Sequence, residues 1–316
     1  MDESTQEYKY LVFEGASTKI YAYLGAIQVL EEKGIIGKIN TFLGTSSGSI
    51  ISLLLILGYT SEEIKKIIFD VDTDKYGGDI CKVLGIYNMY STYGYVNPEK
   101  YIQWIKDVIA NKTGNGNITF QELYNLTKKD LIATGTCLNK RESHYYHRFS
   151  NGNMPVFKAI QISTALPFLF PPINWKGDIL VDGGILENYP IYYIKPDGSF
   201  PNTRKEIVKY NHKKHKKINE FTLGVKVTST QEKNNEFNDQ INGLIDFGTS
   251  IFNTLLTQIE RNSIKKGYYL NTIEIVIPNT INNFQLKLST ESKEQLFTFG
   301  KNFTINFFDK KEIIDD

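Results

Sequence analysis

The chain has 316 residues, of which 41% are hydrophobic, and this content suffices for one large hydrophobic core or two small ones. The 36 Lys and Arg residues nearly balance the 35 Asp and Glu residues, so no overall electrostatic field favours nucleic acid or an acidic partner. Two cysteines, Cys81 and Cys137, are too few for a disulfide framework or a cysteine-rich metal site.

The ends and the apolar runs of the sequence bear on localisation. The first seven residues are polar and acidic, and they lack the basic and apolar regions of a secretory signal. The longest apolar run, residues 50–57, is far shorter than the roughly 20 residues that span a bilayer. We therefore expect a cytoplasmic protein in a reducing compartment, with no signal peptide or transmembrane segment, that meets membranes only at their surface.

The first elements alternate between strand and helix. Residues 8–13 read as a buried strand, and residues 14–20 as a turn rich in small side chains. Residues 22–33 carry apolar side chains at helical spacing. A second strand, residues 39–43, leads through a glycine-rich turn into the apolar run 50–57. This βαβα order predicts a mostly parallel sheet with helices on both faces.

The same alternation continues along the chain, with no linker, internal repeat or low-complexity block. Further helices are predicted at residues 60–68, 99–109, 156–163, 241–264 and 290–308, with a short turn or helix at 119–123. Further strands are predicted at residues 130–136, 178–181, 221–227 and 272–277, with an edge hairpin at 145–149. Residues 71–96 read as irregular, and the basic run from Arg204 to Lys217 as a solvated surface loop. The sequence predicts one α/β domain over residues 1–316.

The turn after the second strand, Gly44-Thr45-Ser46-Ser47-Gly48, has the pattern Gly-x-Ser-x-Gly. A sharp turn from strand to helix needs small residues on its flanks, and Gly44 and Gly48 supply them. Ser46 then stands at the N-terminus of a helix, where backbone N–H groups favour a developing negative charge. We predict that Ser46 is a nucleophile.

A serine hydroxyl needs a base, and the four histidines are poorly placed to be one. His144 and His147 lie in the predicted hairpin, and His212 and His215 in the Lys-rich loop. None of them follows the end of a strand. Their i, i+3 spacing is compatible with a metal pair, but no third ligand is evident, so we predict no metal site.

Asp182 is better placed as a base. It follows the strand 178–181, and Gly183 and Gly184 keep the space beside it open. In a parallel sheet, Asp182 and Ser46 would both lie at the carboxyl ends of strands, where sites of α/β proteins form. Asp182 is therefore a candidate base that acts directly on Ser46.

These motifs, in this order, resemble those of the patatin-like phospholipases. The resemblance rests on Gly44 to Gly48, on Asp182-Gly183-Gly184 followed by Leu186 to Pro190, and on the segments 13–15, 22–32, 159–171 and 288–308. It implies a three-layer α/β/α fold with a nucleophile elbow, a core of about residues 9–195 and completion of the same fold by about residues 218–310. It also implies a Ser46–Asp182 dyad that needs neither metal nor cofactor.

One motif departs from that family. The first loop of the family reads Gly-Gly-Gly-x-Arg/Lys-Gly and forms the oxyanion hole, whereas this chain reads Gly15-Ala16-Ser17-Thr18-Lys19-Ile20. The resemblance assigns the oxyanion hole to the N–H groups of Gly15, Ala16, Ser17 and Ser47. An Ala or Ser at positive φ would cost roughly 1–2 kcal/mol, and one misdirected N–H about 10²–10³ in rate. Lys19 is expected to steady an oxyanion or a phosphate head group.

The expected function is a serine acyl hydrolase that cleaves fatty-acyl esters of phospholipids or lysophospholipids. The altered loop leaves open a catalytically impaired, lipid-binding or interaction module, and the same dyad would also suit a thioesterase or a neutral-lipid esterase. A membrane surface is expected to meet the run from Arg204 to Lys217, or the Tyr-rich stretch from Val83 to Tyr95, which otherwise serves as a lid or core. No nucleic-acid partner is predicted, and the sequence is silent on a protein activator.

Overall fold

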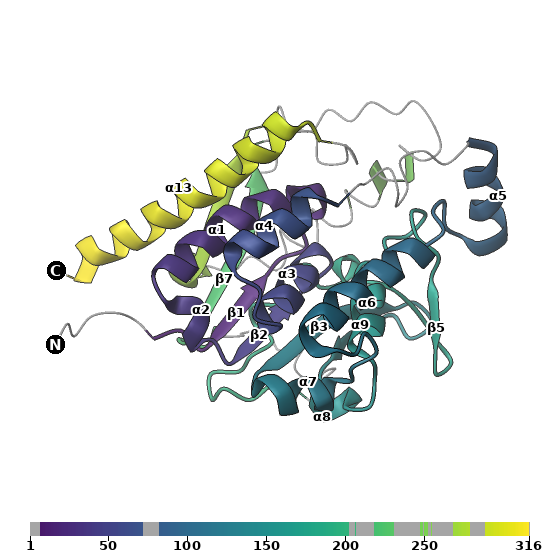
Figure 1. Ribbon diagram of the computed structural model, residues 1–316, viewed down its shortest axis with the longest axis horizontal. Helices are drawn as coiled ribbons and strands as arrows, with labels where there is room; N and C mark the ends of the chain where they lie inside the picture. Colours follow the sequence, from purple (N-terminus) through teal and green to yellow (C-terminus); the bar gives the residue numbers. More distant parts are fainter. Residues whose placement is uncertain are drawn as a thin grey trace.

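The computed structural model describes residues 7–71, 82–201, 218–230, 268–278 and 288–315, together with residues 206, 247, 248, 250, 251 and 254. Within these ranges an eight-stranded sheet has the order β5-β6-β3-β2-β1-β7-β8, and β4 pairs with β3 (Figure 1). The strands are β1 (Tyr10–Phe13), β2 (Thr41–Gly44), β3 (Asp130–Cys137), β4 (Glu142–Tyr146), β5 (Ile173–Trp175), β6 (Asp178–Asp182), β7 (Thr222–Ser229) and β8 (Thr272–Ile277).

The described helices fill the chain between the strands. They are α1 (Ile20–Glu32), α2 (Ile35–Lys38), α3 (Ser47–Ile56), α4 (Ser61–Phe69), α5 (Lys82–Thr92), α6 (Glu99–Thr113), α7 (Phe120–Thr127), α8 (Arg148–Asn151), α9 (Val156–Ser163) and α13 (Thr290–Asp315). The short 3₁₀ turns are η1 (Ser17–Lys19), η3 (Gly183–Ile185) and η4 (Tyr268–Asn271). None of these helices combines the length and the apolar composition that crossing a bilayer requires.

The sheet is mostly parallel, as the alternation of strands and helices predicted. Strand β1 pairs in parallel with both β2 and β7, β2 pairs in parallel with β3, and β7 with β8. The β4–β3–β6–β5 end of the sheet is different, because β4 and β6 run antiparallel to β3 and β5 runs antiparallel to β6. We call these four strands the antiparallel corner.

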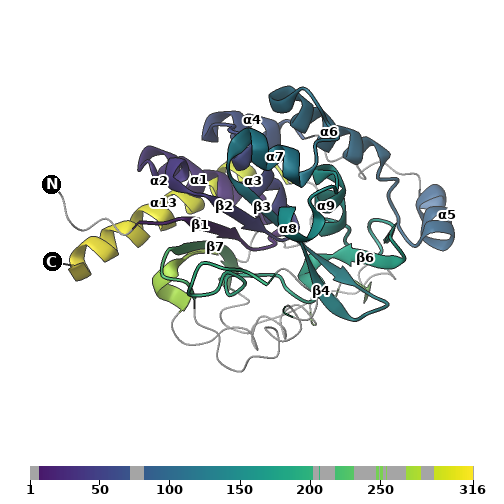
Figure 2. The same cartoon turned by 90° about the horizontal axis from the view of Figure 1, so that it is seen from below.

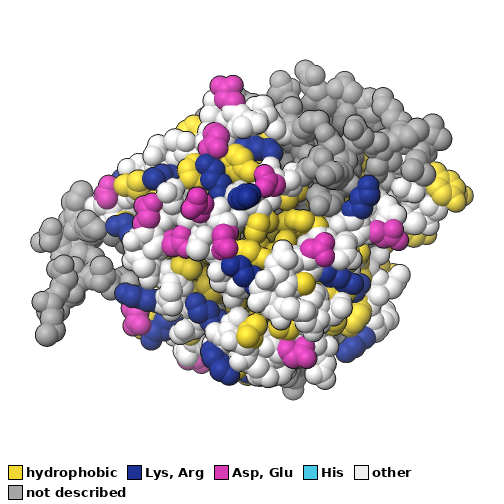
Figure 3. Space-filling view, in the orientation of Figure 1, with side chains coloured by type: hydrophobic (Ala, Val, Ile, Leu, Met, Phe, Trp, Pro, Cys, Tyr) yellow, Lys and Arg dark blue, Asp and Glu magenta, His cyan; other side chains and the backbone are white. Residues whose placement is uncertain are grey.

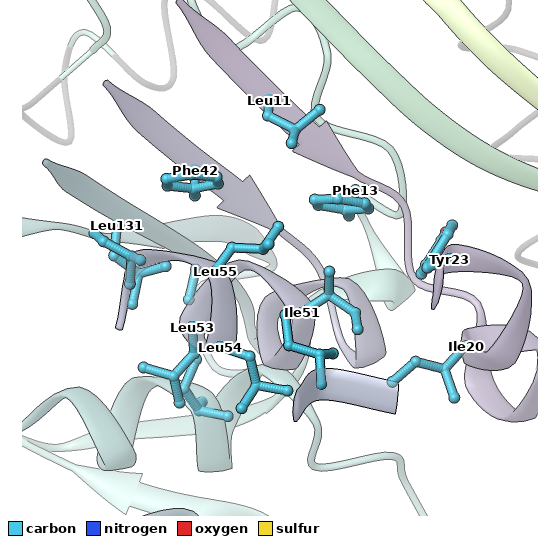
Figure 4. Packing of buried hydrophobic residues seen from close by; sticks show 14 of the residues in the cluster. Leu11, Phe13, Ile20, Tyr23, Phe42, Ile51, Leu53, Leu54, Leu55 and Leu131 are labelled. Atoms are coloured by element: carbon cyan, nitrogen blue, oxygen red, sulfur yellow. The ribbon is translucent and has the colours of Figure 1, made fainter. Parts of the chain in front are cut away.

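Alternation along the central strands divides the core between the two faces of the sheet. Leu11, Phe13 and Phe42 join one cluster with buried side chains of α1, α3, α4, α6, α7, α9 and α13, and Figure 4 shows Phe13 and Phe42 directed toward helix α3. Val12 and Leu43 join a second cluster on the opposite face. Figure 2 shows helices α1, α3, α4, α6, α7 and α9 on one side of the sheet. Within the described ranges, the segment after η3 covers the other side.

Two helices begin where the sequence carries a capping box. The Thr60 side chain accepts a hydrogen bond from the Glu63 N–H, and the Glu63 carboxylate accepts one from the Thr60 N–H, so both donors at the start of α4 are satisfied. Thr119 and Glu122 repeat the arrangement at α7. Such local patterns are readable in the sequence because both partners lie within one turn.

Some predictions were wrong. Residues 82–92, expected to be irregular, form α5, which stands out at the edge of the molecule in Figure 1. Strand β5 was not predicted, and the short element at 119–123 extends to residue 127. The predicted helix 241–264 and the run from Arg204 to Lys217 lie, apart from isolated positions, outside the described residues.

Candidate active site

The Gly-x-Ser-x-Gly segment forms a tight turn between β2 and α3. Ser46 has φ 51° and ψ −125°, a backbone conformation that residues other than glycine rarely adopt. A Cβ at Gly44 would lie 2.2 Å from the Gly48 carbonyl oxygen, and one at Gly48 would lie 2.5 Å from the Glu14 carbonyl oxygen. Only glycine fits at these two positions, so the two flanks of the turn close on each other and hold Ser46 at the start of the helix.

Neighbouring hydroxyls fix the strained backbone of Ser46. Its N–H donates to Ser163 Oγ at 3.0 Å, at the end of α9. Its carbonyl oxygen accepts from Ser49 Oγ at 2.6 Å, one turn into α3. Both peptide groups of the elbow residue are therefore held while its side chain is left for chemistry.

Asp182 ends β6 and meets Ser46. The Ser46 hydroxyl lies close enough to the Asp182 carboxyl group to lower the pKa of that group. The expected reason for this proximity was wrong, because β6 is antiparallel to β3 rather than part of the parallel sheet. Strand β3 runs past the level of Gly44, which pairs with Ala133, and β6 returns along this extension until Asp182 faces Gly135. The returning strand thus delivers its last residue to the elbow.

The Asp182 carboxyl group is only 2% exposed. This burial raises its pKa from the usual 3.8 to about 7, although hydrogen bonds from Gly184 and Ser46 act in the opposite direction. The Gly184 N–H donates to Asp182 Oδ1 at 2.7 Å, from the turn that Gly183 begins. A carboxylate with a pKa near neutrality is suited to take a proton from a hydroxyl and return it.

Two of the four N–H groups expected to form the oxyanion hole donate to other acceptors. The Gly15 N–H donates to the Asn188 carbonyl oxygen at 3.0 Å, and the Ala16 N–H donates to Ser47 Oγ at 2.9 Å. Both N–H groups are therefore occupied, and the expectation that they face an oxyanion is wrong for this conformation. Within the described ranges, the N–H groups of Ser17 and Ser47 donate to no acceptor outside their own helices, and each is the first residue of its helix.

The conformational cost foreseen for the loop falls on one residue. Ser17 has φ 48°, whereas Ala16 has φ −125° and Ile20 φ −49°, both ordinary for side chains with a Cβ. Ile20 starts α1 and is buried in the main core beside Ile51 (Figure 4). Lys19 is also buried, with 8% of its surface exposed, so it lies beneath the loop rather than out in solvent.

The segment after Asp182 ties the elbow and the first loop together. Asn188 holds Gly15 twice, since its carbonyl oxygen accepts the Gly15 N–H and its Nδ2 donates to the Gly15 carbonyl oxygen at 3.1 Å. Thr45 Oγ1 donates to the Glu187 carbonyl oxygen at 3.0 Å. One short stretch of chain therefore sets the positions of both the loop and the elbow relative to Asp182.

The described histidines are engaged elsewhere. His144 Nε2 lies 3.1 Å from Glu142 Oε1, and the buried His147 contacts Tyr193 and Ser150. Burial lowers the pKa of His147 to about 4, so it is neutral at physiological pH. His212 and His215 lie outside the described residues.

Sequence reasoning missed two residues that position the site. Ser163 is the acceptor for the Ser46 N–H, and Asn188 is the clamp on Gly15. Both stand in segments that carry the family resemblance, which was the only available signal. Their partners lie 117 and 173 residues away along the chain, so no local pattern reveals the contacts.

Comparison with known proteins identifies the family of the chain. A family model described as patatin-like phospholipase matches residues 11–194. Over 301 residues the chain is 26% identical to the probable lipid hydrolase 463L of Invertebrate iridescent virus 6, covering 93% of this chain and 86% of that protein. Over 298 residues it is 28% identical to the uncharacterized protein R571 of Acanthamoeba polyphaga mimivirus, covering 94% of this chain and 92% of that one.

Among solved structures, the fold is similar to that of VipD from Legionella pneumophila, with a TM-score of 0.61 and 18% sequence identity, over 98% of this chain and 68% of VipD. The family model covers more than half of the chain and both motifs of the site. The chain therefore belongs to the patatin-like phospholipase family.

Proposed function

We propose that the protein is a serine acyl hydrolase that cleaves fatty-acyl esters of phospholipids or lysophospholipids. The observation that carries the proposal is the proximity of Ser46, held at a strained elbow, to the buried carboxyl group of Asp182. A structural serine in a turn needs neither the strain nor a buried acid beside it. The family of the chain and the name of the viral relative, a probable lipid hydrolase, support a lipid ester as substrate.

The reaction follows from the two side chains. Ser46 Oγ attacks the ester carbonyl carbon while Asp182 accepts the hydroxyl proton, which gives a tetrahedral oxyanion. Collapse of this intermediate expels the alcohol, to which Asp182 returns the proton, and leaves an acyl-serine. Asp182 then takes a proton from a water molecule that attacks the acyl-serine. When the second tetrahedral intermediate collapses, Asp182 returns this proton to Ser46 Oγ, and the fatty acid is released.

The oxyanion is assigned to the N–H groups of Ser17 and Ser47. Ser47 is the first residue of α3, so its N–H also carries the positive end of the helix dipole. Positive φ at Ser17 sets the direction of that peptide group in the loop opposite the elbow. Two donors at such positions stabilise the charge that develops in the transition state.

An exposed aromatic surface supports action at a lipid interface. Tyr87, Tyr90 and Tyr93, on or just after α5, are 65%, 88% and 70% exposed. Figure 3 shows hydrophobic side chains at the end of the molecule where Figure 1 places α5. Tyrosine is favoured at membrane–water interfaces because its ring is apolar and its hydroxyl is polar. We assign membrane contact to this aromatic surface, alongside the predicted contact from Arg204 to Lys217.

The experiment measures fatty-acid release from phospholipid and lysophospholipid vesicles by the wild type, Ser46→Ala and Asp182→Asn. Both variants should lose activity by about 10³-fold or more, while Ser199→Ala, an exposed serine outside the site, should behave as the wild type. Triacylglycerol emulsions and acyl thioesters in the same assay test the alternative substrates. Wild-type rates in Ser46→Ala would overturn the dyad.

A second candidate function is a lipid-binding module without catalysis. The engaged N–H groups of Gly15 and Ala16 favour it, because they reduce the donors available to an oxyanion. A fluorophosphonate probe distinguishes the two, since it requires an activated serine. Labelling at Ser46 supports the hydrolase, whereas an unlabelled, folded protein that still binds vesicles supports the module.

A further inference from the structure

Beyond the proposed dyad, three side chains of metal-ligating type converge on the antiparallel corner. One ligand atom each from Cys137, His144 and Asp178 lies within 4.8 Å of the others. They come from three strands, β3, β4 and β6. Cys137 is fully buried, while the side chains of His144 and Asp178 are 22% and 17% exposed. The group is therefore shielded but open on one side.

Strand register explains why these residues meet. Cys137 faces Leu180 on β6, and Asp178 lies two residues before Leu180, so both side chains are on the same face of the sheet. Gly135, two residues before Cys137, faces His144 on β4. A Cβ at Gly135 would lie 2.8 Å from the Ile162 side chain and 2.9 Å from the Tyr146 ring, so the absence of a side chain leaves room for these two neighbours. The pairing of β3 with β4 and with β6 therefore places the three side chains on one face of the sheet.

A buried hydroxyl without a partner points to a missing ligand at the same place. Tyr146, on the same face as His144, is 3% exposed, and its hydroxyl has no hydrogen-bond partner among the described residues. A Cβ at Gly135 would lie 3.2 Å from this hydroxyl, so the hydroxyl lies over β3, two residues before Cys137. An unpaired buried hydroxyl is costly, and a metal-bound water or a thiolate would satisfy it.

We propose that Cys137, His144 and Asp178 bind a zinc ion. A thiolate, an imidazole and a carboxylate form a ligand set that zinc accepts, with bonds of about 2.0–2.3 Å, and a water molecule or Glu142 completes four-coordination. Glu142 Oε1 also lies 3.1 Å from His144 Nε2, as carboxylates do when they orient a metal-bound imidazole. Binding displaces the Cys137 proton to solvent. This proposal departs from the sequence prediction of no metal site.

Two other groups must move on binding. Cys137 Sγ donates to Asn139 Oδ1 at 3.1 Å, and Lys140 Nζ lies 2.8 Å from Asp178 Oδ2. The Lys140 side chain is 35% exposed, so it can turn into solvent. Its ammonium competes with the metal for Asp178, and its removal is therefore expected to strengthen binding. The ion would link the strands that flank β3 and brace the strand that ends in Asp182.

The test uses the full chain, freed of metal and kept reduced, and titrated with zinc and with cobalt(II). The wild type should retain one zinc per chain after gel filtration, should melt at a higher temperature with zinc, and should show the thiolate-to-cobalt absorption band. Cys137→Ser should lose the band, and Cys137→Ser, His144→Ala and Asp178→Asn should each weaken zinc binding by about tenfold or more. Lys140→Ala should strengthen it.

Two controls separate this site from other thiols and imidazoles. Cys81→Ser and the double variant His212→Ala/His215→Ala should bind zinc as the wild type does, because the proposal assigns the ion to Cys137, His144 and Asp178 alone. Circular dichroism verifies that each variant is folded. Wild-type affinity in folded Cys137→Ser, or no zinc retained by the wild type, would overturn the proposal. None of these readouts depends on ester hydrolysis.

Discussion

At the scale of single residues, the proposed role of the buried Asp182 predicts how activity depends on pH. In the proposed mechanism Asp182 must be ionised to accept the Ser46 proton, and burial raises its pKa to about 7. The rate at low substrate concentration should therefore rise with pH and reach half its plateau near pH 7. Initial rates on a soluble ester between pH 5 and 9 check this. A plateau already complete at pH 5 would contradict an Asp182 base with this pKa.

The same pKa predicts an effect on stability. A carboxyl group whose pKa is higher in the folded than in the unfolded state stabilises the fold while protonated, and this stabilisation is lost as the pH rises from about 4 through about 7. Asp182→Asn keeps an acceptor for the Gly184 N–H but carries no charge. Its melting temperature relative to the wild type should therefore increase between pH 5 and pH 8. An equal difference at both pH values would show that Asp182 does not ionise in this range.

Asn188 is expected to act through the first loop rather than on the substrate. Asn188→Ala removes the hydrogen bond to the Gly15 carbonyl oxygen but retains the backbone bond from the Gly15 N–H. If this clamp directs the loop at the oxyanion, kcat should fall by about tenfold or more while KM changes little. Asn139→Ala, in the turn between β3 and β4, is the matched control. Unchanged kcat would leave Asn188 a purely structural residue.

At the scale of elements, the sequence predicts most of what is local. The spacing of apolar residues predicted β1, β2, α1 and α3, and capping residues predicted the start of α4. These signals can be read because they lie within a few neighbouring residues. The elbow was readable for the same reason. The direction of β6 could not be predicted, because residues 178–182 carry no local signal for the strand with which they pair. Nor could the sequence reveal that the Gly15 N–H would donate to Asn188 and the Ala16 N–H to Ser47, because both acceptors lie far away along the chain.

A buried ion pair joins two of the central strands beside the first loop. Glu14 follows β1 and Lys226 lies in β7, and Lys226 Nζ is 3.1 Å from Glu14 Oε1. The Glu14 side chain is 2% exposed and the Lys226 side chain 5% exposed. Lys226→Met would leave the carboxylate buried without its cation, and this should lower the free energy of unfolding by roughly 3–5 kcal/mol. Urea denaturation measures the change.

The matched control for this pair is the double variant Glu14→Gln/Lys226→Met. It removes both charges, so it should recover much of the lost stability. Glutamine also keeps an acceptor for the Val227 N–H, which now donates to Glu14 at 3.3 Å. If the double variant were as unstable as Lys226→Met, the cost would come from lost packing rather than from an unpaired charge.

At the scale of the whole molecule, the helices α1, α3, α4 and α13 lie together over the parallel part of the sheet, while α5 projects from the opposite end (Figure 1). The chain after α5 returns to the site, since Tyr95 N–H donates to the Phe168 carbonyl oxygen and Phe168 lies in the segment that leads from α9. Phe168 is itself 55% exposed. The chain that leaves α5 is thus joined to the segment between α9 and β5, as the proposed action at a membrane surface would require.

This arrangement predicts a variant that separates membrane contact from chemistry. Replacing Tyr87, Tyr90 and Tyr93 together with serine removes aromatic area that would enter the interface, at about 25 cal/mol per Å². Hydrolysis of phospholipid vesicles and co-sedimentation with them should both fall by about tenfold or more, whereas hydrolysis of a soluble short-chain ester should not change. Leu126→Ser, which removes a 60% exposed apolar side chain from α7, should leave both activities intact. A parallel loss on both substrates would instead assign α5 to the fold of the active site.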